Sequence, residues 1–146
     1  MRPSNNPSKT QSGSERTPSF VCEIPLQVAP AQAHALNARL EAARQVDNAC
    51  LGEALKQARL LNERRAYRKA RNLPKGKERT ETFKEVRQSV AFSDAALQRY
   101  AVRLRQEAFG DALDVQVAQK LASRAFAAVN AWLLGKRGRP RFKGAR

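Results

Sequence analysis

Between Leu113 and Lys143 the sequence passes from an apolar pattern with a helical period into a run of basic residues. Apolar side chains recur there at three- and four-residue steps, which is the spacing of one face of an α-helix. These side chains are Val115, Val117, Ala118, Leu121, Ala125, Ala128, Val129, Trp132 and Leu133. Gly135 ends the pattern and is followed by Lys136-Arg137-Gly138-Arg139-Pro140-Arg141-Phe142-Lys143. We therefore expect a core-forming helix that continues into a basic segment.

A long amphipathic helix is predicted from about Ala31, with Pro30 in the first turn, where a proline is tolerated. Its other residues are mainly Ala, Arg, Glu and Gln, which are good helix formers. The stretch Val46-Asp47-Asn48 has a lower helix propensity, so the pattern fits either one bent helix or two consecutive helices. The apolar stripe consists of Leu36, Leu40, Ala43, Val46 or Asp47, Cys50, Ala54, Ala58 and Leu61.

Two shorter helices are expected between these long ones. The first runs from about Thr80 to Val90 and the second from about Asp94 to Ala108. Ser93 is a good N-cap for the second of these helices, and Gly110 ends it. Asp114 or the loop before it is expected to cap the last helix.

A strand is predicted for residues 20–28, because this segment is rich in β-branched and aromatic residues. Pro25 cannot donate to a ladder, so the strand would lie at an edge or be interrupted there. A single strand is not stable alone, and the only extended candidate to pair with it is Arg139 to Lys143. Residues 1–19 are rich in Ser, Asn, Pro, Thr and Gly and are expected to form a disordered tail.

The expected fold is therefore mainly α, in a single domain over residues 20–146. Its body would contain four or five helices, with one or two β-strands beside them. The strand at 20–28 and the basic extended segment at 136–146 would form the minor β element.

The chain has 28 Lys and Arg residues against 13 Asp and Glu, a formal net charge of +15. Such an excess points to an anionic partner, with nucleic acid as the first candidate. Ten cations gather around the end of the long helix and the following loop, far more than are needed to complement a helix dipole. Tyr67 lies among them and could either stack on a base or cover the helix face. The residues predicted to bind nucleic acid are Lys56, Arg59, Arg64, Arg65, Arg68, Lys69, Arg71, Lys75, Lys77, Lys136, Arg137, Arg139, Arg141 and Lys143.

No catalytic or metal-binding constellation is present in the sequence. Cys22 and Cys50 are far apart, and the single His34 completes no metal-ligand pattern with them. The acidic residues lie where helix capping or ion pairing explains them, and no glycine-rich phosphate loop occurs. We expect no enzyme activity from this chain alone, no cofactor and no metal. The apolar runs are too short to cross a membrane, so we expect a cytoplasmic protein.

The basic segment at the end of the chain has two interpretations. Arg137-Gly138-Arg139-Pro140 is similar to the core of an AT-hook, an arm that lies in the minor groove of A·T-rich DNA. Alternatively, Phe142 turns the segment into a packed strand, from which Arg139, Arg141 and Lys143 alternate outward to phosphates.

The order of these motifs resembles the N-terminal part of TnpB-type transposon-associated proteins, the RNA-guided nucleases from which compact type V CRISPR effectors derive. The residues that carry the resemblance are Asp47-Asn48 in the long helix, where Tyr-Asn is usual, Val115-Gln116 before the last helix, and Pro140-Arg141-Phe142-Lys143 near the end. The resemblance covers roughly residues 20–144.

This resemblance implies the first strand of a wedge-like β-barrel with an inserted helical recognition lobe, which holds guide RNA and target DNA. The RuvC-like nuclease carboxylates of that family are absent from this chain. By this resemblance the chain would be a truncated form, a fragment or a separately encoded piece, with the missing nuclease part or other effector subunits as further partners.

Three classes of function follow from the sequence. The first is a nucleic-acid-binding N-terminal module of a TnpB-like protein or type V effector, without nuclease activity of its own. The second is a free-standing basic helical DNA-binding protein with an AT-hook-like arm. The third is an interaction protein whose basic face binds an acidic partner; an anionic membrane is disfavoured, because the helices lack the large apolar residues of an interfacial helix.

Overall fold

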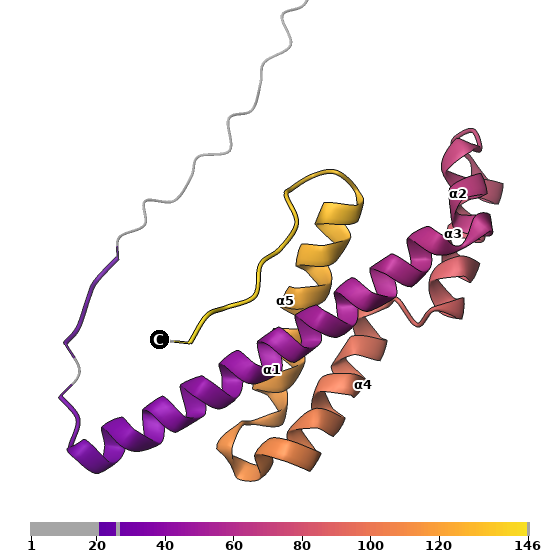
Figure 1. Cartoon of the computed structure of the whole chain (residues 1–146). Coiled ribbons are helices and arrows are strands. Elements are labelled where there is room, and N and C mark those ends of the chain that lie inside the picture. Colours follow the sequence, from indigo (N-terminus) through magenta and orange to yellow (C-terminus); the bar gives the residue numbers. More distant parts are fainter. Residues whose placement is uncertain (1–20, 26, 146) are drawn as a thin grey trace, which may run out of the picture.

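A computed structural model describes residues 21–25 and 27–145 of the chain (Figure 1). Its helices are α1 (Pro30–Glu63), α2 (Arg65–Asn72), α3 (Lys77–Ser89), α4 (Asp94–Leu104) and α5 (Val115–Leu133). A π-helical turn, Arg105–Phe109, continues α4, and a 3-10 turn, Gly110–Ala112, leads towards α5.

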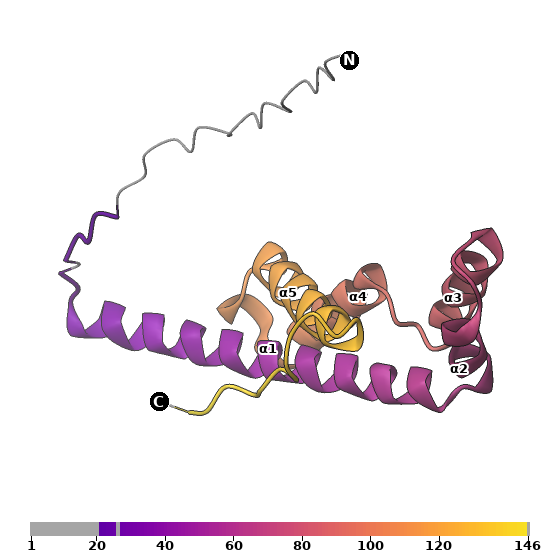
Figure 2. The same ribbon diagram turned by 90° about the horizontal axis from the view of Figure 1, so that it is seen from above.

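Helix α1 is a single continuous element of 34 residues, and no break occurs at Val46-Asp47-Asn48. Packing explains this continuity, because Val46 and Asp47 are both buried there, whereas Leu36 and Leu40 nearer the start of the helix are 42% and 66% exposed. The chain breaks instead at Arg64, whose backbone is extended with φ −68° and ψ 124°. This single residue separates α1 from α2 and turns the chain away from the axis of α1 (Figures 1 and 2).

The core lies between α1, α4 and α5, which form a three-helix body (Figure 2). Small side chains line the helix contacts, since Ala54, Ala58, Ala101, Ala118 and Ala122 are all fully buried. Alanines at these positions let the helix backbones approach closely. The larger buried side chains, which fill the remaining space, are Phe92, Leu61, Leu97, Val46, Val129 and Cys50. Each fully buried leucine or phenylalanine contributes about 1.5–3 kcal/mol to folding.

Helices α2 and α3 form a hairpin at the far end of α1, and its buried residues Tyr67 and Val86 continue the core of the three-helix body (Figures 1 and 2). Tyr67 on α2 meets Phe83 on α3 edge to face, with ring centroids 5.3 Å apart. The Arg79 guanidinium lies 5.5 Å from the Phe83 ring and donates to the Leu73 carbonyl at 3.3 Å. The turn between the two helices is therefore closed by a partly buried arginine.

The caps of α4 and α5 follow the sequence prediction. The Ser93 hydroxyl accepts from the Ala96 N–H at 3.2 Å, and the Asp114 carboxylate accepts from the Gln116 N–H at 2.7 Å. Gly135 has a φ of +70°, and the Lys136 N–H donates to the Ala131 carbonyl at 2.9 Å. This is the glycine-terminated helix end that the sequence predicts after α5.

The prediction of β-strands is wrong for the described residues, none of which forms a strand. Residues 21–25 and 27–29 are extended but unpaired, and Val21 and Ile24 are 92% and 83% exposed. The segment at 139–143 is also extended, but it follows α1 and meets side chains there, so no backbone edge is offered to it. Phe20, Leu26, Arg146 and the predicted tail at 1–19 lie outside the described residues.

Within the described part of the chain, none of the helices combines the length and the apolar character that a membrane span requires.

Candidate nucleic-acid interface

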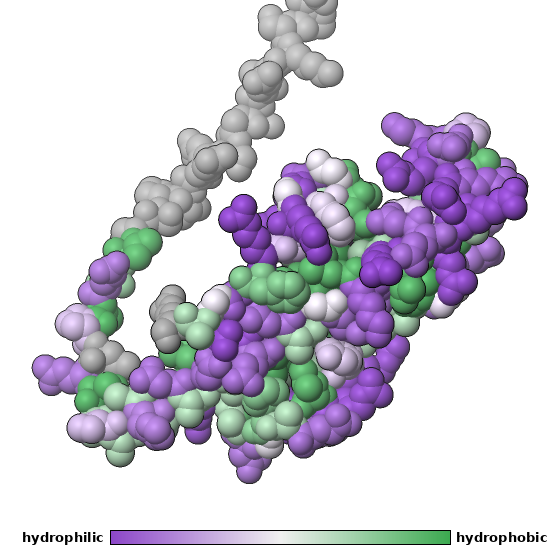
Figure 3. Space-filling view, in the orientation of Figure 1, coloured by the Kyte–Doolittle hydropathy of each residue, from purple (hydrophilic) through white to green (hydrophobic). Residues whose placement is uncertain are grey.

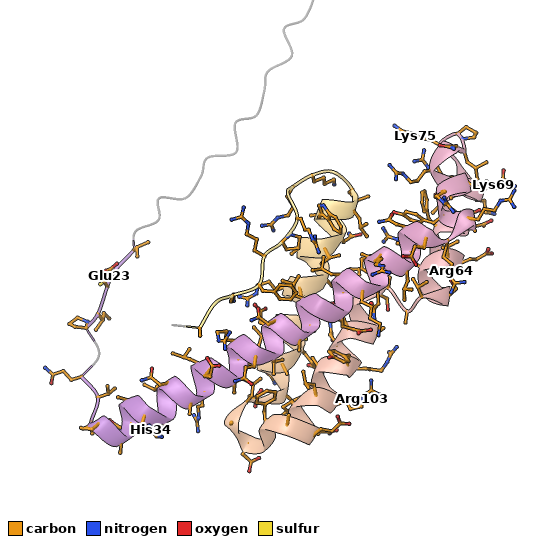
Figure 4. All side chains as sticks on the ribbon, viewed as in Figure 1. Glu23, His34, Arg64, Lys69, Lys75 and Arg103 are labelled. Carbon is orange, nitrogen blue, oxygen red and sulfur yellow. The ribbon has the colours of Figure 1, made fainter. Side chains whose placement is uncertain are left out.

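The first group of predicted binding residues gathers on the hairpin and at the end of α1 that leads to it. Figure 3 shows hydrophilic side chains concentrated over this end of the molecule, and Figure 4 places Arg64, Lys69 and Lys75 there. We call this set the hairpin surface; it consists of Arg64, Arg65, Arg68, Lys69, Arg71, Lys75 and Lys77, all of which are exposed. The long helix carries Lys56 and Arg59 on the approach to it.

Few carboxylates neutralise the hairpin surface. Lys77 pairs with Glu81 at 3.9 Å, and Arg68 donates to the Glu63 carbonyl at 3.5 Å. On α1, Lys56 lies 3.8 Å from Glu53 and Arg59 lies 2.9 Å from Glu63. Among the residues that the structure describes, six cations of the surface have no ion-pair partner; they are Arg64, Arg65, Arg68, Lys69, Arg71 and Lys75.

Tyr67 does not belong to this surface as a base-stacking residue. Its side chain is only 5% exposed and packs against Phe83 inside the hairpin. Of the two roles that the sequence allowed, the structure therefore shows the one in which Tyr67 covers the helix face.

The second group of predicted residues lies on residues 136–145, which we call the strap. After α5 the strap turns back and runs beside α1 (Figures 1 and 2). Its attachment is concentrated at Lys143, whose backbone N–H donates to the Asn48 Oδ1 at 2.8 Å. The Asn48 Nδ2 donates back to the Lys143 carbonyl at 2.9 Å, and the Arg44 guanidinium donates to the same carbonyl at 3.0 Å. The Asn48 amide thus pairs with one residue of the strap as a neighbouring strand would.

The side chain of Lys143 is also held on α1. Its Nζ lies 2.9 Å from Asp47 Oδ2, while Asp47 Oδ1 pairs with Arg124 of α5 at 2.7 Å. Asp47 is buried, but Lys143 and Arg124 are about half exposed. One carboxylate therefore joins α1, α5 and the strap.

The prediction for Lys143 and Phe142 needs correction. Lys143 does not alternate outward to phosphates, because Asp47 holds it. Phe142 does not enter the core either; it is 57% exposed and lies over Gly52 of α1, on the helix turn after Asn48. The strap is attached at the α5 end by the Gly135 turn and at the other end by Lys143, so it is not the free arm that an AT-hook requires. Lys136, Arg137, Arg139 and Arg141 remain exposed between these two points.

A cleft of about 480 Å³ lies where α1, the end of α5 and the strap meet. Its walls include Lys56 and Arg59 from α1, Trp132 from α5 and Arg139 from the strap. The Arg139 guanidinium lies 6.0 Å from the Trp132 ring centroid, within the range of a cation–π contact. From the sequence, Trp132 is placed in the apolar stripe of the helix and is not predicted to bind a ligand. One feature of the sequence could have indicated a role in binding: Trp132 is the single tryptophan and lies four residues before the basic run.

The sequence also did not predict that residues of α1 anchor the strap. Arg44 is oriented by Glu41, to which it donates two hydrogen bonds, and hydrogen bonds from Arg44 and Gln45 hold the pKa of Glu41 at about 2. Glu41 therefore remains ionised in any neutral solution and keeps Arg44 pointing to the Lys143 carbonyl.

Over residues 21–25 and 27–145, groups suited to metal chemistry do not converge. His34 is exposed near the start of α1, far from the hairpin (Figure 4). Burial raises the pKa of the Cys50 thiol to about 12, so this cysteine stays protonated. In the described ranges, no group of three His, Cys, Asp or Glu side chains lies close enough together to hold a metal ion.

Comparison with known proteins returns no matching family model, no matching curated protein and no matching solved structure.

Proposed function

We propose that this chain binds nucleic acid by contacting phosphates with the hairpin surface and the exposed part of the strap. The observation that carries the proposal is the set of six exposed cations of the hairpin surface that have no ion-pair partner among the described residues. A surface that only complemented a helix dipole would need one or two such charges. Phosphates relieve the repulsion among these cations, and the released counterions make the binding favourable.

The anchored strap supports the same proposal. A mobile basic tail loses conformational entropy when it binds, whereas this strap is already fixed beside α1 by Asn48 and Asp47. Its exposed arginines are therefore positioned before the ligand arrives. Contacts of this kind give affinity and register, and little sequence information.

We further propose that the binding belongs to an N-terminal module of a TnpB-like protein or type V effector, with guide RNA or target DNA as the ligand and no nuclease activity in this chain. The support is that Asn48, which matches the second residue of the usual Tyr-Asn, contacts Lys143 at the end of Pro140-Arg141-Phe142-Lys143 directly, whereas Asp47 departs from that pattern. The strands that the resemblance implies are not part of the proposal. We place the protein in the cytoplasm, where its unpaired Cys22 and Cys50 fit a reducing compartment.

The proposal is tested with two variants of equal charge. In the first, Arg65, Lys69 and Lys75 of the hairpin surface are changed to Gln. In the second, the matched control, Arg99 and Arg103 of α4 and Lys120 of α5 are changed to Gln. All six are exposed and lack an ion-pair partner among the described residues, and each variant lowers the net charge by three.

Affinity for single-stranded and duplex oligonucleotides is measured by fluorescence anisotropy over a range of salt concentrations. The hairpin variant should bind more weakly, with a salt slope for single strands reduced by about 2, because three phosphate contacts are lost. The control should stay close to the wild type. Equal losses in the two variants would show that only net charge matters, and the proposed surface would be wrong. Tighter binding to an acidic protein than to either nucleic acid would favour the interaction-protein function instead.

A further inference from the structure

The cleft beside Trp132 lies between the two basic surfaces. Arg139 of the strap forms one wall of the cleft. Asn62 and Glu63 form the wall next to Arg64, where the hairpin begins. The cleft therefore lies on a direct path for a strand of nucleic acid that contacts both surfaces. This inference rests on the proposed function, and it concerns what the cleft holds.

The size and chemistry of the cleft fit one nucleotide. Its volume of about 480 Å³ lies in the range of small-molecule sites. Trp132 supplies an aromatic face, and aromatic faces are the platforms on which proteins stack unpaired bases. Lys56 and Arg59 lie on the α1 side, where Lys56 is 3.8 Å from Glu53 and Arg59 is 2.9 Å from Glu63, so a phosphate would compete with these glutamates for the two cations. Asn62 supplies an amide, which can pair with the polar edge of a base.

The spacing of Arg139 and Trp132 is close to that of a stacking site. The guanidinium is 6.0 Å from the ring centroid. A flat base between them needs two contact distances, or about 7 Å in total. Arg139 is exposed and lies on the strap, so a small outward movement of its side chain would admit the base. Arginine planes stack on bases as aromatic rings do.

We propose that this cleft takes one unpaired nucleobase of a bound single strand, stacked between Trp132 and Arg139, with the neighbouring phosphates on Lys56 and Arg59. The ligand class is thus single-stranded DNA or RNA, or an unpaired nucleotide of a structured one. A base inside a regular duplex is stacked on its neighbours and cannot enter.

Trp132 is the single tryptophan of the chain, so its emission reports directly on the cleft. The whole protein is titrated with a thymidine oligonucleotide of about twelve nucleotides and with an abasic strand of the same length, which has the same phosphates without bases. Anisotropy of an end label follows binding, and tryptophan emission follows stacking. The thymidine strand should quench Trp132. The abasic strand should bind about tenfold more weakly and leave the emission unchanged.

Each other outcome has a defined meaning. If both strands bind equally well and neither changes the emission, the proposed function stands and the base site is wrong. Poly-aspartate, a polyanion without bases, is titrated in the same way as a charge control. If it or the abasic strand quenches Trp132 as strongly as the thymidine strand, the cleft responds to charge alone and the base site is again wrong. If no strand binds by anisotropy, the proposed function fails.

Two strap variants supply a matched pair. Arg139→Gln removes the cation above Trp132, and Arg137→Gln removes an exposed strap cation that does not line the cleft. Both should weaken binding by loss of one phosphate contact. Only Arg139→Gln should also reduce the preference for the thymidine strand over the abasic strand. An equal preference in the two variants would overturn the role of Arg139.

Discussion

The hairpin and the strap carry similar basic sequences, yet they are held in different ways. The hairpin is closed by its own aromatic pair, Tyr67 and Phe83, and its cations point outward. The strap has no core of its own. It is fixed to α1 by the amide of Asn48 and the carboxylate of Asp47, and the latter takes up Lys143.

This difference shows that a basic run cannot be equated with a binding surface. The hairpin is held together by the packing of Tyr67 against Phe83, which leaves most of its positive charge exposed. The strap is held partly by one of its own cations, because Lys143 forms an ion pair with Asp47. In the strap, fewer cations are therefore available to phosphate than the sequence contains. In the hairpin, nearly all of them are available.

The largest effect is expected from Tyr67→Ala. This change removes the buried half of the hairpin core and should destabilise the hairpin by about 3–5 kcal/mol. Amide hydrogen exchange should accelerate throughout α2 and α3 and stay unchanged in α5 and around Lys143, because the strap does not depend on the hairpin. Faster exchange in both regions would show that the two are not held independently.

A smaller effect is expected from Asn48→Ala, which removes both amide hydrogen bonds to Lys143. Their loss should weaken the attachment of the strap by about 1–2 kcal/mol. Tryptic cleavage after Arg137 and Arg141 should then become about 5- to 30-fold faster, since cleavage follows the population of the detached form. Asn72→Ala, at the exposed end of α2, is the control and should leave the rate unchanged. No change in Asn48→Ala would mean that Asp47 and Arg44 hold the strap without the amide.

A still smaller effect, in the opposite direction, is expected from Asp47→Asn. Loss of this carboxylate releases Lys143 and Arg124, of which Lys143 lies on the strap. One additional phosphate contact should steepen the salt slope of single-strand binding by about 0.7. Glu107→Gln makes the same change in net charge without releasing a cation and should leave the slope as it is. A weaker slope in Asp47→Asn would show that a detached strap no longer contributes to binding.

The smallest effect is expected at the cysteines, which test whether these variants leave the three-helix body intact. At about pH 8 the exposed Cys22 should react with a thiol reagent, and the buried Cys50 should not, in the wild type and in all variants above.

Burial raises the pKa of Cys50 from 9.0 to about 12, so its contribution to stability is present below pH 9 and is lost as the pH rises to 12. Reaction of Cys50 at about pH 8 in a variant would show that the body has opened.

Local patterns predicted the helices well because each carries its own signals. The apolar stripes of α1 and α5 have the helical period, and Ser93, Asp114 and Gly135 cap helices as predicted. Propensity was misleading at Val46-Asp47-Asn48, where burial against α5 keeps the helix continuous. The break at Arg64 carries no glycine or proline and could not be located from the sequence.

The candidate site was only partly predictable. The cations of the hairpin surface could be identified because they are dense and consecutive in the sequence. The strand prediction for residues 20–28 failed because β-branched composition says nothing about whether a partner edge exists. The cleft could not be predicted, since Trp132, Arg139 and Arg59 come from three different elements and meet only through the turn at Gly135.

The sequence by itself determined the helical class, the caps and the strongly basic charge, because these depend on residues close together in the chain. Only the tertiary structure decided where the basic run at the end goes, since its partners Asp47 and Asn48 lie 95 or more residues away in the sequence. Tertiary structure also decided which cations remain exposed, because pairing depends on which carboxylates come within reach. The run after Gly135 is therefore a strap that is fixed to α1, and Trp132 at its base becomes the wall of a cleft.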